Sequence, residues 1–411
     1  MSRIDDLIAK HCPDGVPFYP MWRLTTWDKK FNAVDSYKQP RIEKYRYLLA
    51  KELSPLIVGG GDVKILTTNE SDLWANEESI DGPIHEAEIV AIPSGGNAIV
   101  QHYSGRFVTS DNRIAVANDP TKLNMRFLYY FMTNNLGELA SFYRGSGIKH
   151  PSMAKVLDWL IPVPPLEVQR AIVEVLDTFS KLEAELEAEL EARKQQYEHY
   201  KSGAFELSSE TTQVPLGELV DLLQGFAFKS SMYVESGIRI VRISDVQKGA
   251  MSNKDLKYYP ESAEDEIARY KLNTGDLVMS LSGSVGRVAM LAESDLPAVL
   301  NQRVACIRPN TPRVITRYLF HYLNTNRFEQ EAIASTSGGI VKNLSSRWLK
   351  EILIPLPTIE AQERIVSILD KFDALVNDLS VGLPAELAAR RQQYEYYRDK
   401  LLTFKELEVA A

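Results

Sequence analysis

A long helical segment occurs twice in this chain, and the duplication constrains the fold more than any other feature. Ile161 to Phe179 (IPVPPLEVQRAIVEVLDTF) and Ile354 to Phe372 (IPLPTIEAQERIVSILDKF) agree at ten of 19 positions. A second match, Ala192 to Tyr200 against Ala389 to Tyr397, agrees at seven of nine. The first match is 193 positions apart and the second 197, so the later copy has gained about one helical turn. The repeat predicts a pseudo-two-fold molecule framed by paired helices.

Apolar spacing predicts that both copies are long helices. Between Ile172 and Leu186 the apolar residues step by three and four positions along one face. A helix from about Leu166 to Lys201 would be roughly 54 Å long at 1.5 Å per residue. The run L-E-A-E-L-E-A-E-L interrupts the heptad spacing as a stutter, and its glutamates are expected to form a solvated face. The later copy contains Gly382 and Pro384, which bend or interrupt a helix.

The two segments that precede these helices are distant copies of each other. Short motifs occur in the same order in both: Tyr19-Pro20-Met21 and Val214-Pro215-Leu216, Arg113-Ile114-Ala115 and Arg303-Val304-Ala305, Arg126-Phe127-Leu128 and Arg317-Tyr318-Leu319, Lys149 and Lys342. Each segment has short strand-like runs broken by glycine and serine, and then a short helix. We therefore predict two α+β globular domains joined by two long antiparallel helices in a coiled coil.

The predicted division of the chain is 1–160 (an N-terminal helix and the first globular domain), 161–206 (the central helix), 207–353 (the second globular domain) and 354–411 (the C-terminal helix). The N-terminal helix, around Ile4 to Ala9, is expected where the end of a long helix stands before the second domain. This placement would give the fold a circular arrangement.

Composition narrows the class of protein. With 411 residues, 45% of them hydrophobic, the chain should hold two or more domains with separate cores. No apolar run approaches the about 18 residues of a membrane span, and the first residues lack a signal-peptide core, so we expect a cytoplasmic protein without membrane contact. Two cysteines, Cys12 and Cys306, and six scattered histidines do not suggest a disulfide framework or a zinc site.

Four motifs and the duplicated organisation carry a family resemblance. The motifs are GFAFKS at Gly225 to Ser230, GDLVMSLSGSVGR at Gly275 to Arg287, LNQRVA at Leu300 to Ala305 and IPLPTIEAQERIV at Ile354 to Val366. Along its whole length the chain resembles the specificity subunit of type I restriction-modification enzymes. The L-E-A-E run resembles the short spacer repeat of one subgroup. The first domain departs from the motifs, because Ser94-Gly95-Gly96 replaces S-G-S.

The resemblance implies a function in DNA methylation and defence against foreign DNA. Each globular domain would be a target recognition domain for one half of an asymmetric bipartite site in double-stranded DNA. The helices would set the spacing and dock two adenine-methyltransferase (modification) subunits, and restriction/translocase subunits would join the full complex. S-adenosylmethionine, ATP and Mg are expected only in those partner subunits, and no cofactor in this chain.

Charge and loop composition indicate where DNA contacts would lie. The net charge of −8 opposes DNA binding, but the segment from Met21 to Glu52 holds eight Lys or Arg against four Asp or Glu. Small residues before Arg287 let the backbone approach DNA, and Asn301, Gln302 and Arg303 supply groups that recognise adenine and guanine edges. The alternative explanation is structural: the small residues before Arg287 would form a glycine-rich hairpin, and Asn301 to Arg303 would be the polar end of a strand. The candidate DNA contacts are Lys29, Lys30, Lys38, Arg41, Lys44, Arg113, Lys149, Lys229, Arg242, Ser282, Ser284, Arg287, Asn301, Gln302, Arg303 and Lys342.

Motifs that are missing argue against catalysis by this chain. The sequence has no N-P-P-[YF] tetrapeptide of adenine methyltransferases and no G-x-x-x-x-G-K-[ST] cradle for ATP. No serine, cysteine or histidine constellation stands out as a nucleophile. We therefore expect a non-catalytic subunit. Two alternatives remain: a helical scaffold whose globular domains bind protein and not DNA, and an enzyme with a cryptic active site. The sequence does not reveal which bases are recognised.

Overall fold

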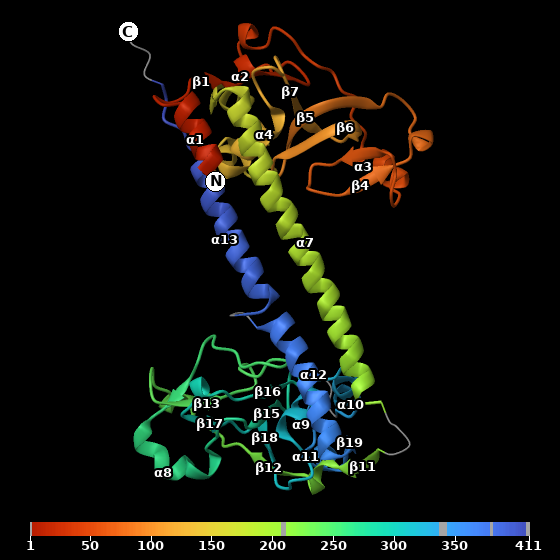
Figure 1. The fold of residues 1–411 in the computed structure, drawn as a ribbon, viewed down its shortest axis with the longest axis vertical. Coiled ribbons are helices and arrows are strands. Elements are labelled where there is room, and N and C mark those ends of the chain that lie inside the picture. Colours follow the sequence, from red (N-terminus) through yellow and green to blue (C-terminus); the bar gives the residue numbers. More distant parts are fainter. Residues whose placement is uncertain (1, 207–210, 337–342, 379–380, 408–411) are drawn as a thin grey trace. The chain divides into compact units, whose positions relative to one another are not determined.

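The structure, a computed structural model, describes residues 2–206, 211–336, 343–378 and 381–407. The chain divides into two compact units (Figure 1). Unit 1 comprises Met1–Glu185 and Ala388–Ala411, and unit 2 comprises Leu186–Leu387. Segments from both ends of the sequence therefore belong to the same unit. Within the described ranges, no helix combines the length and the apolar character that crossing a membrane requires.

Unit 1 contains a mixed six-stranded sheet in the order β2-β7-β5-β6-β3-β4. Helix α4 covers one face, where its Leu128 and Met132 are buried in one cluster with Val90 and Ile92 of β5. The elements that begin in this unit are α1 (Ser2–His11), β1 (Phe18–Pro20), α2 (Met21–Leu24), β2 (Thr25–Trp27), α3 (Ala50–Leu53), β3 (Val63–Leu66), β4 (Leu73–Ala75), β5 (His85–Pro93), β6 (Gln101–Thr109), β7 (Asn112–Ala117), α4 (Met125–Asn134), α5 (Leu136–Ser141), β8 (Tyr143–Arg144), β9 (His150–Pro151), α6 (Met153–Asp158), β10 (Leu160–Pro162) and α7 (Leu166–Ala204).

Unit 2 contains two sheets, β12-β18-β15-β16 and β14-β13-β17. The elements that begin in it are β11 (Thr212–Pro215), β12 (Val220–Gln224), β13 (Ile238–Val241), β14 (Tyr258–Tyr259), α8 (Glu264–Ile267), β15 (Leu277–Ser280), β16 (Val288–Met290), β17 (Ala298–Leu300), β18 (Val304–Pro309), α9 (Thr316–Leu323), α10 (Asn326–Ala334), α11 (Ser346–Glu351), β19 (Leu353–Leu356), α12 (Ile359–Asn377) and α13 (Leu383–Leu402).

The two domains share one topology. In unit 1 the long strand β6 pairs with β5 and, in parallel, with β3. In unit 2 these pairings are divided, because β16 pairs with β15 while β17 pairs in parallel with β13. A separate two-stranded ribbon precedes each long helix, with Tyr19 opposite Ile161 in one unit and Val214 opposite Ile354 in the other. Both pairs join residues that the sequence repeat aligns, so the predicted duplication of the globular segments is confirmed.

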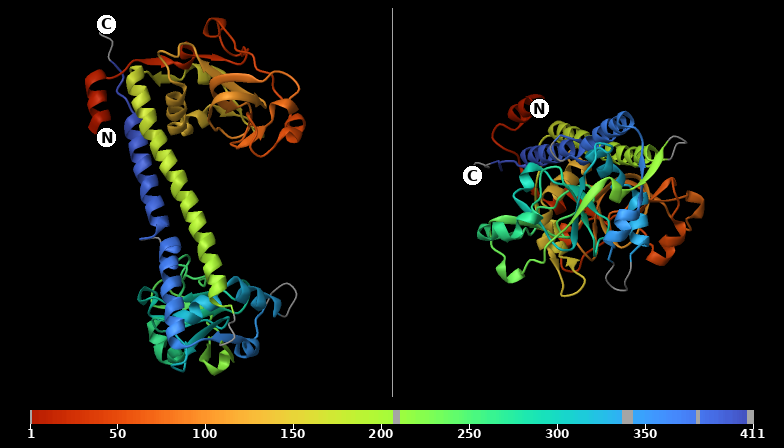
Figure 2. Two further views of the ribbon diagram at one scale, coloured as in Figure 1. Left: turned by 45° about the vertical axis from the view of Figure 1, so that its right-hand side comes forward. Right: turned by 90° about the horizontal axis from the view of Figure 1, so that it is seen from below.

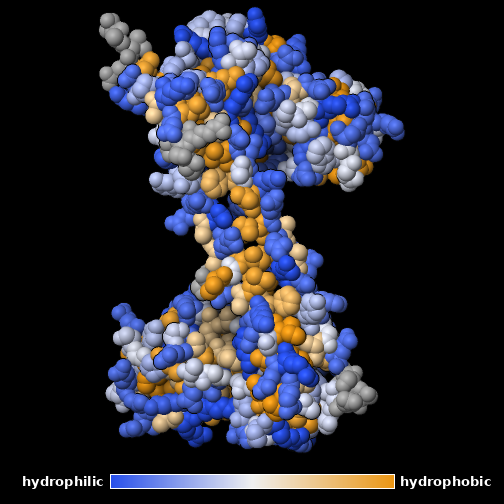
Figure 3. Space-filling model, viewed as in Figure 1, coloured by the Kyte–Doolittle hydropathy of each residue, from blue (hydrophilic) through white to orange (hydrophobic). Residues whose placement is uncertain are grey.

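The long helices follow the prediction closely. Helix α7 begins at Leu166, as expected, and continues to Ala204. The later copy is interrupted where Gly382 and Pro384 predict an interruption, so α12 ends at Asn377 and α13 begins at Leu383. Hydrophobic residues reach the surface along these helices (Figure 3), including Leu182, Tyr200, Ile368 and Tyr396.

Helix pairing is antiparallel in each unit. In unit 1, Phe179 stacks on Tyr397 and Glu183 pairs with Arg391, so the positions rise along α7 as they fall along α13. In unit 2, Tyr200 stacks on Phe372, and a small hollow further along α7 is lined by Gly203, Ala204, Ile365 and Ile368. The predicted α+β class with long antiparallel helices is thus confirmed.

The circular arrangement is completed by the C-terminal segment. The amide of Val16 donates to the carbonyl of Lys405 (2.9 Å), and the amide of Leu407 donates to the carbonyl of Val16 (2.9 Å). The end of α13 therefore stands before the first domain as the end of α7 stands before the second. The sequence assigned this place to the N-terminal helix; instead α1 packs beside α13, and Ile4 shares a buried cluster with Leu401 (Figures 1 and 2).

Candidate nucleic-acid interface

The candidate residues of the second domain gather at one edge of its sheets. Strands β13 and β17 are parallel, so the residues that come after them, Arg242 and Asn301, are neighbours, and the Asn301 amide donates to the carbonyl of Val241 (3.1 Å). The amide of Leu281, after β15, donates to the carbonyl of Arg303, before β18 (2.9 Å). Residues that are far apart in the sequence thus form one continuous set of loops.

The loop between β15 and β16 is held by a serine. The Ser280 hydroxyl donates to the carbonyl of Ser284 and accepts from the amide of Arg287. Gly283 and Gly286 have φ angles of +73° and +79°, a left-handed conformation that glycine adopts without strain. Arg287 is partly exposed, and its Nη1 donates to Oε1 of Gln247 (2.9 Å). The loop conformation and the bond to Gln247 together fix the direction of the Arg287 guanidinium.

The two serines of this loop have different environments. Ser284 is exposed, whereas Ser282 is 3% exposed. The Ser282 hydroxyl has no hydrogen-bond partner among the described residues, and its backbone forms a bridge with Asn343. The sequence did not distinguish the two, because Ser282 pairs with Asn343, 61 positions later. Only Ser284 is accessible to a ligand in this conformation.

The glycine of the GFAFKS motif, Gly225, is needed because the backbone of another loop passes close to it. A Cβ atom on Gly225 would lie 2.1 Å from the carbonyl oxygen of Asn301, so a larger residue would force the two loops apart. The Gln302 amide donates to the carbonyl of Phe226 (2.9 Å), and the side chains of Gln302 and Arg303 are exposed. Lys229 is exposed in the same loop.

The candidates of the first domain also converge on one edge of the sheet. Pro93, which ends β5, is paired with Asn112, which begins β7. Asp111 accepts from the Ser94 hydroxyl (2.6 Å) and from Nη1 of Arg113 (2.8 Å). Burial opposes ionisation of Asp111, but these two hydrogen bonds, together with the positive charges of Arg113 and Lys29, outweigh it and lower the pKa of the carboxyl. Asp111 therefore stays charged and holds the Arg113 guanidinium.

Two further candidates adjoin this edge. The Gly96 amide donates to the carbonyl of Lys149 (2.8 Å), which brings the Lys149 loop against the loop after β5. The Lys29 ammonium lies 5.8 Å from the ring centre of Tyr47, and the Tyr47 hydroxyl donates to the buried Asp28 (3.3 Å). Burial raises the pKa of Asp28. The edge thus combines cations with oriented polar groups.

The basic segment after β2 forms a separate hollow. A cavity of about 300 Å3 is lined by Lys29, Lys38 and Arg41 together with Trp22 and Trp27. Its cations differ in freedom. Lys38 bonds to Asp158 through Nζ (2.7 Å), whereas Arg41 is exposed and has no ion pair that involves the described residues. Lys30 and Lys44 are close in sequence to the residues that line the cavity, and both are exposed.

The remaining candidates are Arg242 and Lys342. Arg242 is held by Asp245, whose Oδ1 is 3.0 Å from Nη2, and by the carbonyl of Asp255. Its guanidinium is therefore largely committed within the protein. Lys342 and the Ser337-Gly338-Gly339 loop lie outside the described residues.

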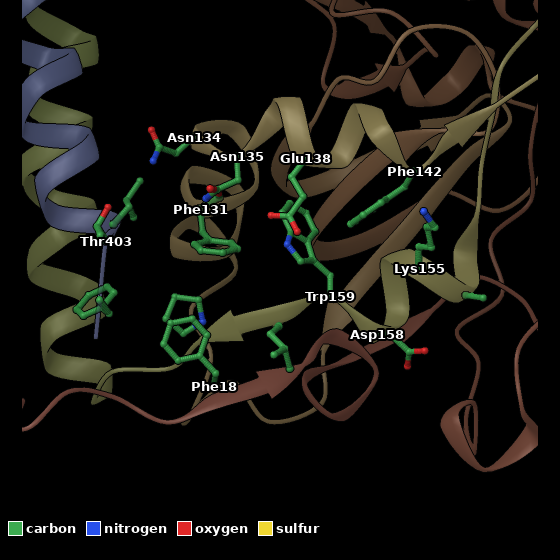
Figure 4. A pocket seen from close by; sticks show the side chains of 15 residues that line it. Phe18, Phe131, Asn134, Asn135, Glu138, Phe142, Lys155, Asp158, Trp159 and Thr403 are labelled. Atoms are coloured by element: carbon green, nitrogen blue, oxygen red, sulfur yellow. The ribbon is translucent and has the colours of Figure 1, made fainter. Parts of the chain in front are cut away.

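A larger hollow in unit 1 is lined by Asp158, the partner of Lys38, but by none of the candidate residues themselves (Figure 4). It has a volume of about 710 Å3 and lies among α4, α5, α6, β10 and the segment from Leu402 to Phe404. The Trp159 ring lies 5.6 Å from Phe131 and 5.5 Å from Phe142, measured between ring centres. No candidate DNA contact lines it, so it does not belong to the interface built above.

The residues that hold the candidate arginines were not predicted from the sequence. Gln247 orients Arg287, and Asp111 with Ser94 orients Arg113. Gln247 has no motif around it, and its role depends on a fold that brings it to a loop 40 positions later. Asp111 precedes Arg113 by two positions, a spacing that would have suggested the contact.

The duplicated domain and helix define the class of this protein: a chain built from two tandem copies of one α+β domain, each followed by a long helix. The chain belongs to the family of type I restriction modification DNA specificity domains, whose model matches residues 9–192 and 208–389. Each match includes one globular domain and most of the helix after it.

Individual relatives agree with this assignment. A Haemophilus influenzae chain assigned as a type I restriction enzyme specificity subunit is 30% identical over 343 residues, which cover 80% of this chain and 86% of that one. The EcoR124I/EcoR124II specificity subunit of Escherichia coli is 29% identical and covers 74% of this chain, with 76% of its own length matched. The crystal structure of the type I restriction-modification S subunit from M. genitalium has the same fold, with a TM-score of 0.61, 15% identity and coverage of 94% and 96%.

Proposed function

We propose that this chain is the DNA sequence-specificity subunit of a type I restriction-modification complex, in which each globular domain recognises one half of an asymmetric bipartite site. The tandem match to the family carries this proposal. The geometry supports it, because the amide, hydroxyl and guanidinium groups that the sequence selects lie at one edge of the sheets in each domain. Such groups distinguish base edges in the major groove.

The candidate residues divide into two proposed roles. The exposed cations Lys30, Arg41 and Lys44, with Lys29 at the basic hollow, would contact phosphates and position the domain. Lys38 is held by Asp158, so we propose that it contacts DNA less directly. Gln302, Arg303 and Arg287, on the loops of the second domain, would contact base edges. Arg113 and Arg242 are held by aspartates, so we propose that they support neighbouring loops and contact DNA less directly.

The partners are proposed on the same basis. Each unit has exposed apolar residues on its long helices, Leu182 and Tyr396 in unit 1 and Ile368 in unit 2, on which a modification subunit can dock. Restriction/translocase subunits complete the proposed complex. The chain itself is proposed to be non-catalytic and cytoplasmic, with S-adenosylmethionine, ATP and Mg bound by its partners.

A titration tests the proposal against a protein-binding scaffold. The net charge of −8 predicts weak DNA binding by the chain alone and tight, specific binding when two modification subunits enclose the duplex. Labelled cognate and random duplexes would be titrated with and without those subunits at several salt concentrations. The proposal requires tight cognate binding that weakens steeply with salt. Equal affinity for both duplexes in the complete complex would contradict it.

A further inference from the structure

A buried glutamine fixes the start of each long helix to its globular domain. In unit 1, Nε2 of Gln169 donates to the carbonyls of Lys122 (2.7 Å) and Pro164 (2.8 Å), and Oε1 accepts from the Asn124 amide (2.9 Å). The side chain is fully buried, and all its partners are backbone groups. Because Asn124 precedes α4, the glutamine connects the first turn of α7 to the beginning of the short helix.

The second unit repeats this cradle. Nε2 of Gln362 donates to the carbonyls of Arg313 (2.9 Å) and Pro357 (3.0 Å), and Oε1 accepts from the amide of Ile315 (2.9 Å). Gln362 is also fully buried, and it is aligned with Gln169 in the sequence repeat. The two glutamines, each two positions after a glutamate that is conserved in the repeat (Glu167 and Glu360), thus have the same structural role in both units.

An ion pair makes a second connection between the same two elements. In unit 1, Nε of Arg126 on α4 donates to Asp177 on α7 (2.9 Å). In unit 2, Arg317 on α9 contacts α12 twice, at Asp370 (2.6 Å) and at Asp373 (2.9 Å). In each unit the aspartate comes eight positions after the glutamine, about 12 Å along a helix.

Two connections this far apart restrict rotation in a way that one cannot. In unit 1, α4 and α7 also share a buried apolar cluster that includes Phe127 and Ile172, and apolar contacts are not directional. Two directional polar attachments about 12 Å apart add resistance to rotation of the domain about either one. This matters for spacing, because one extra base pair displaces a half-site by about 3.4 Å and rotates it by about 35°. A domain free to turn by that angle would accept neighbouring gaps equally.

We propose that Gln169 with Arg126 and Asp177, and Gln362 with Arg317 and Asp370, are positioning residues that hold each recognition domain at a fixed angle to its long helix. This angle, together with helix length, determines which half-site gaps the complex accepts. The inference rests on the proposed function, since it concerns how the two half-sites are spaced. It adds a determinant of spacing that lies outside both the DNA contacts and the L-E-A-E run.

Arg126→Gln and Arg317→Gln test this role, because they remove the ion pairs. They leave in place the buried glutamines and the hydrogen bonds that join Tyr130 to Asp177 and His321 to Asp370, so they weaken the second attachment without unfolding the domain. Arg193→Gln is the matched control. Arg193 pairs with Glu189 on the same helix (2.8 Å), so its loss breaks an ion pair of α7 without disconnecting a domain. Methylation by the complete complex would be measured on duplexes that carry both half-sites at the preferred gap and at gaps one base pair shorter and longer.

The expected result is a loss of gap selectivity. The ratio of rates at the preferred and neighbouring gaps should fall by about two- to fivefold in Arg126→Gln and Arg317→Gln, the range for a partly exposed ion pair. It should stay unchanged in Arg193→Gln. A uniform fall at all three gaps, or no change, would overturn the inference and leave only a structural role. If the unmodified complex itself showed no preference for sequence or gap, the proposed function would fail instead.

Discussion

Arg287 and Arg303 lie on neighbouring loops but differ in freedom. Arg287 is oriented by Gln247, at 2.9 Å, whereas the exposed Arg303 has no carboxylate partner among the described residues. A guanidinium group that is already oriented loses less conformational entropy when it binds. Arg287 is therefore the better prepared of the two for a bidentate contact with guanine, and Gln247 contributes to that preparation.

Replacement of either arginine should reduce recognition of one base pair. We expect Arg287→Ala and Arg303→Ala each to cost about 1–3 kcal/mol on the cognate duplex and to relax specificity at one position. Lys30→Ala, which removes a proposed phosphate contact, should weaken cognate and random duplexes alike. Binding of the complete complex to a panel of single-base variants measures this. Equal losses on cognate and random DNA for the arginines would reassign them to phosphate contact or to structural roles.

Residue types and spacing were enough to predict which loops form the candidate interface, but not how their side chains are engaged. Ser282 and Ser284 are equivalent in sequence, yet only Ser282 is buried, where it pairs with Asn343, 61 positions later. Arg113 and Arg242 were predicted to be DNA contacts, and the fold supplies an aspartate partner for each. Such pairings depend on tertiary contacts between strand ends, which no local pattern encodes.

At the scale of elements, helices were more predictable than sheets. Apolar spacing and prolines placed the start of α7 at Leu166 and the interruption near Gly382, because helix signals are local. The division of β6 into β16 and β17 in the second domain was not predicted. This division depends on pairing between strands that are distant in sequence. The short apolar runs in this part of the sequence are compatible with several strand registers.

The connection in unit 2 contains a histidine, His321, at the position where unit 1 has Tyr130, whose hydroxyl donates to Asp177. His321 is fully buried, its Nε2 lies 2.6 Å from Oδ1 of Asp370, and its Nδ1 has no partner among the described residues. Burial lowers its pKa, against the opposing effect of Asp370 and Asp373, while Arg317 adds to the lowering. The folded protein therefore keeps His321 neutral at pH values where the unfolded chain binds a proton.

Because the pKa of His321 is lower in the folded protein than in the unfolded chain, we predict that the protein becomes less stable in acid. Unfolding free energy should be unaffected by His321 above about pH 6.5 and should fall below it, by at most about 1.4 kcal/mol per pH unit. His321→Gln keeps a donor near Asp370 but does not titrate. Denaturation midpoints at about pH 7.5 and 5.5 would be compared, and the wild type should lose more stability on acidification than the variant. The same loss of stability in both proteins would show that His321 does not cause the pH dependence.

The length of α7 provides a second prediction for an element. One Leu-Glu-Ala-Glu unit inserted after Leu190 lengthens the helix by about 6 Å and rotates the rest of the helix beyond the insertion by about 40°. One base pair adds about 3.4 Å and 35°, so a gap longer by one base pair best restores the angular match. The methylated motif would be determined before and after insertion. An unchanged gap with full activity would mean that helix length does not set the spacing.

The whole molecule repeats one design, in which each globular domain is held on a long helix by a glutamine cradle and an ion pair. The second domain needs only contacts within unit 2, since its sheets, α9 and α12 all lie between Leu186 and Leu387. The duplication was evident from the sequence, because the helix copies retain many identities. The closure of the C-terminal segment on Val16 was not, because it consists of backbone hydrogen bonds.

The central claim is that each domain recognises its half-site independently. The most direct measurement is sequencing of methylated positions in DNA from cells that carry the complete system, with the natural chain and with residues 214–353 replaced by the corresponding domain of a relative. The natural chain should give two half-sites separated by a fixed gap. The chimera should change one half-site and keep the other half-site and the gap. A change in both half-sites, or a motif without two separated parts, would contradict the claim.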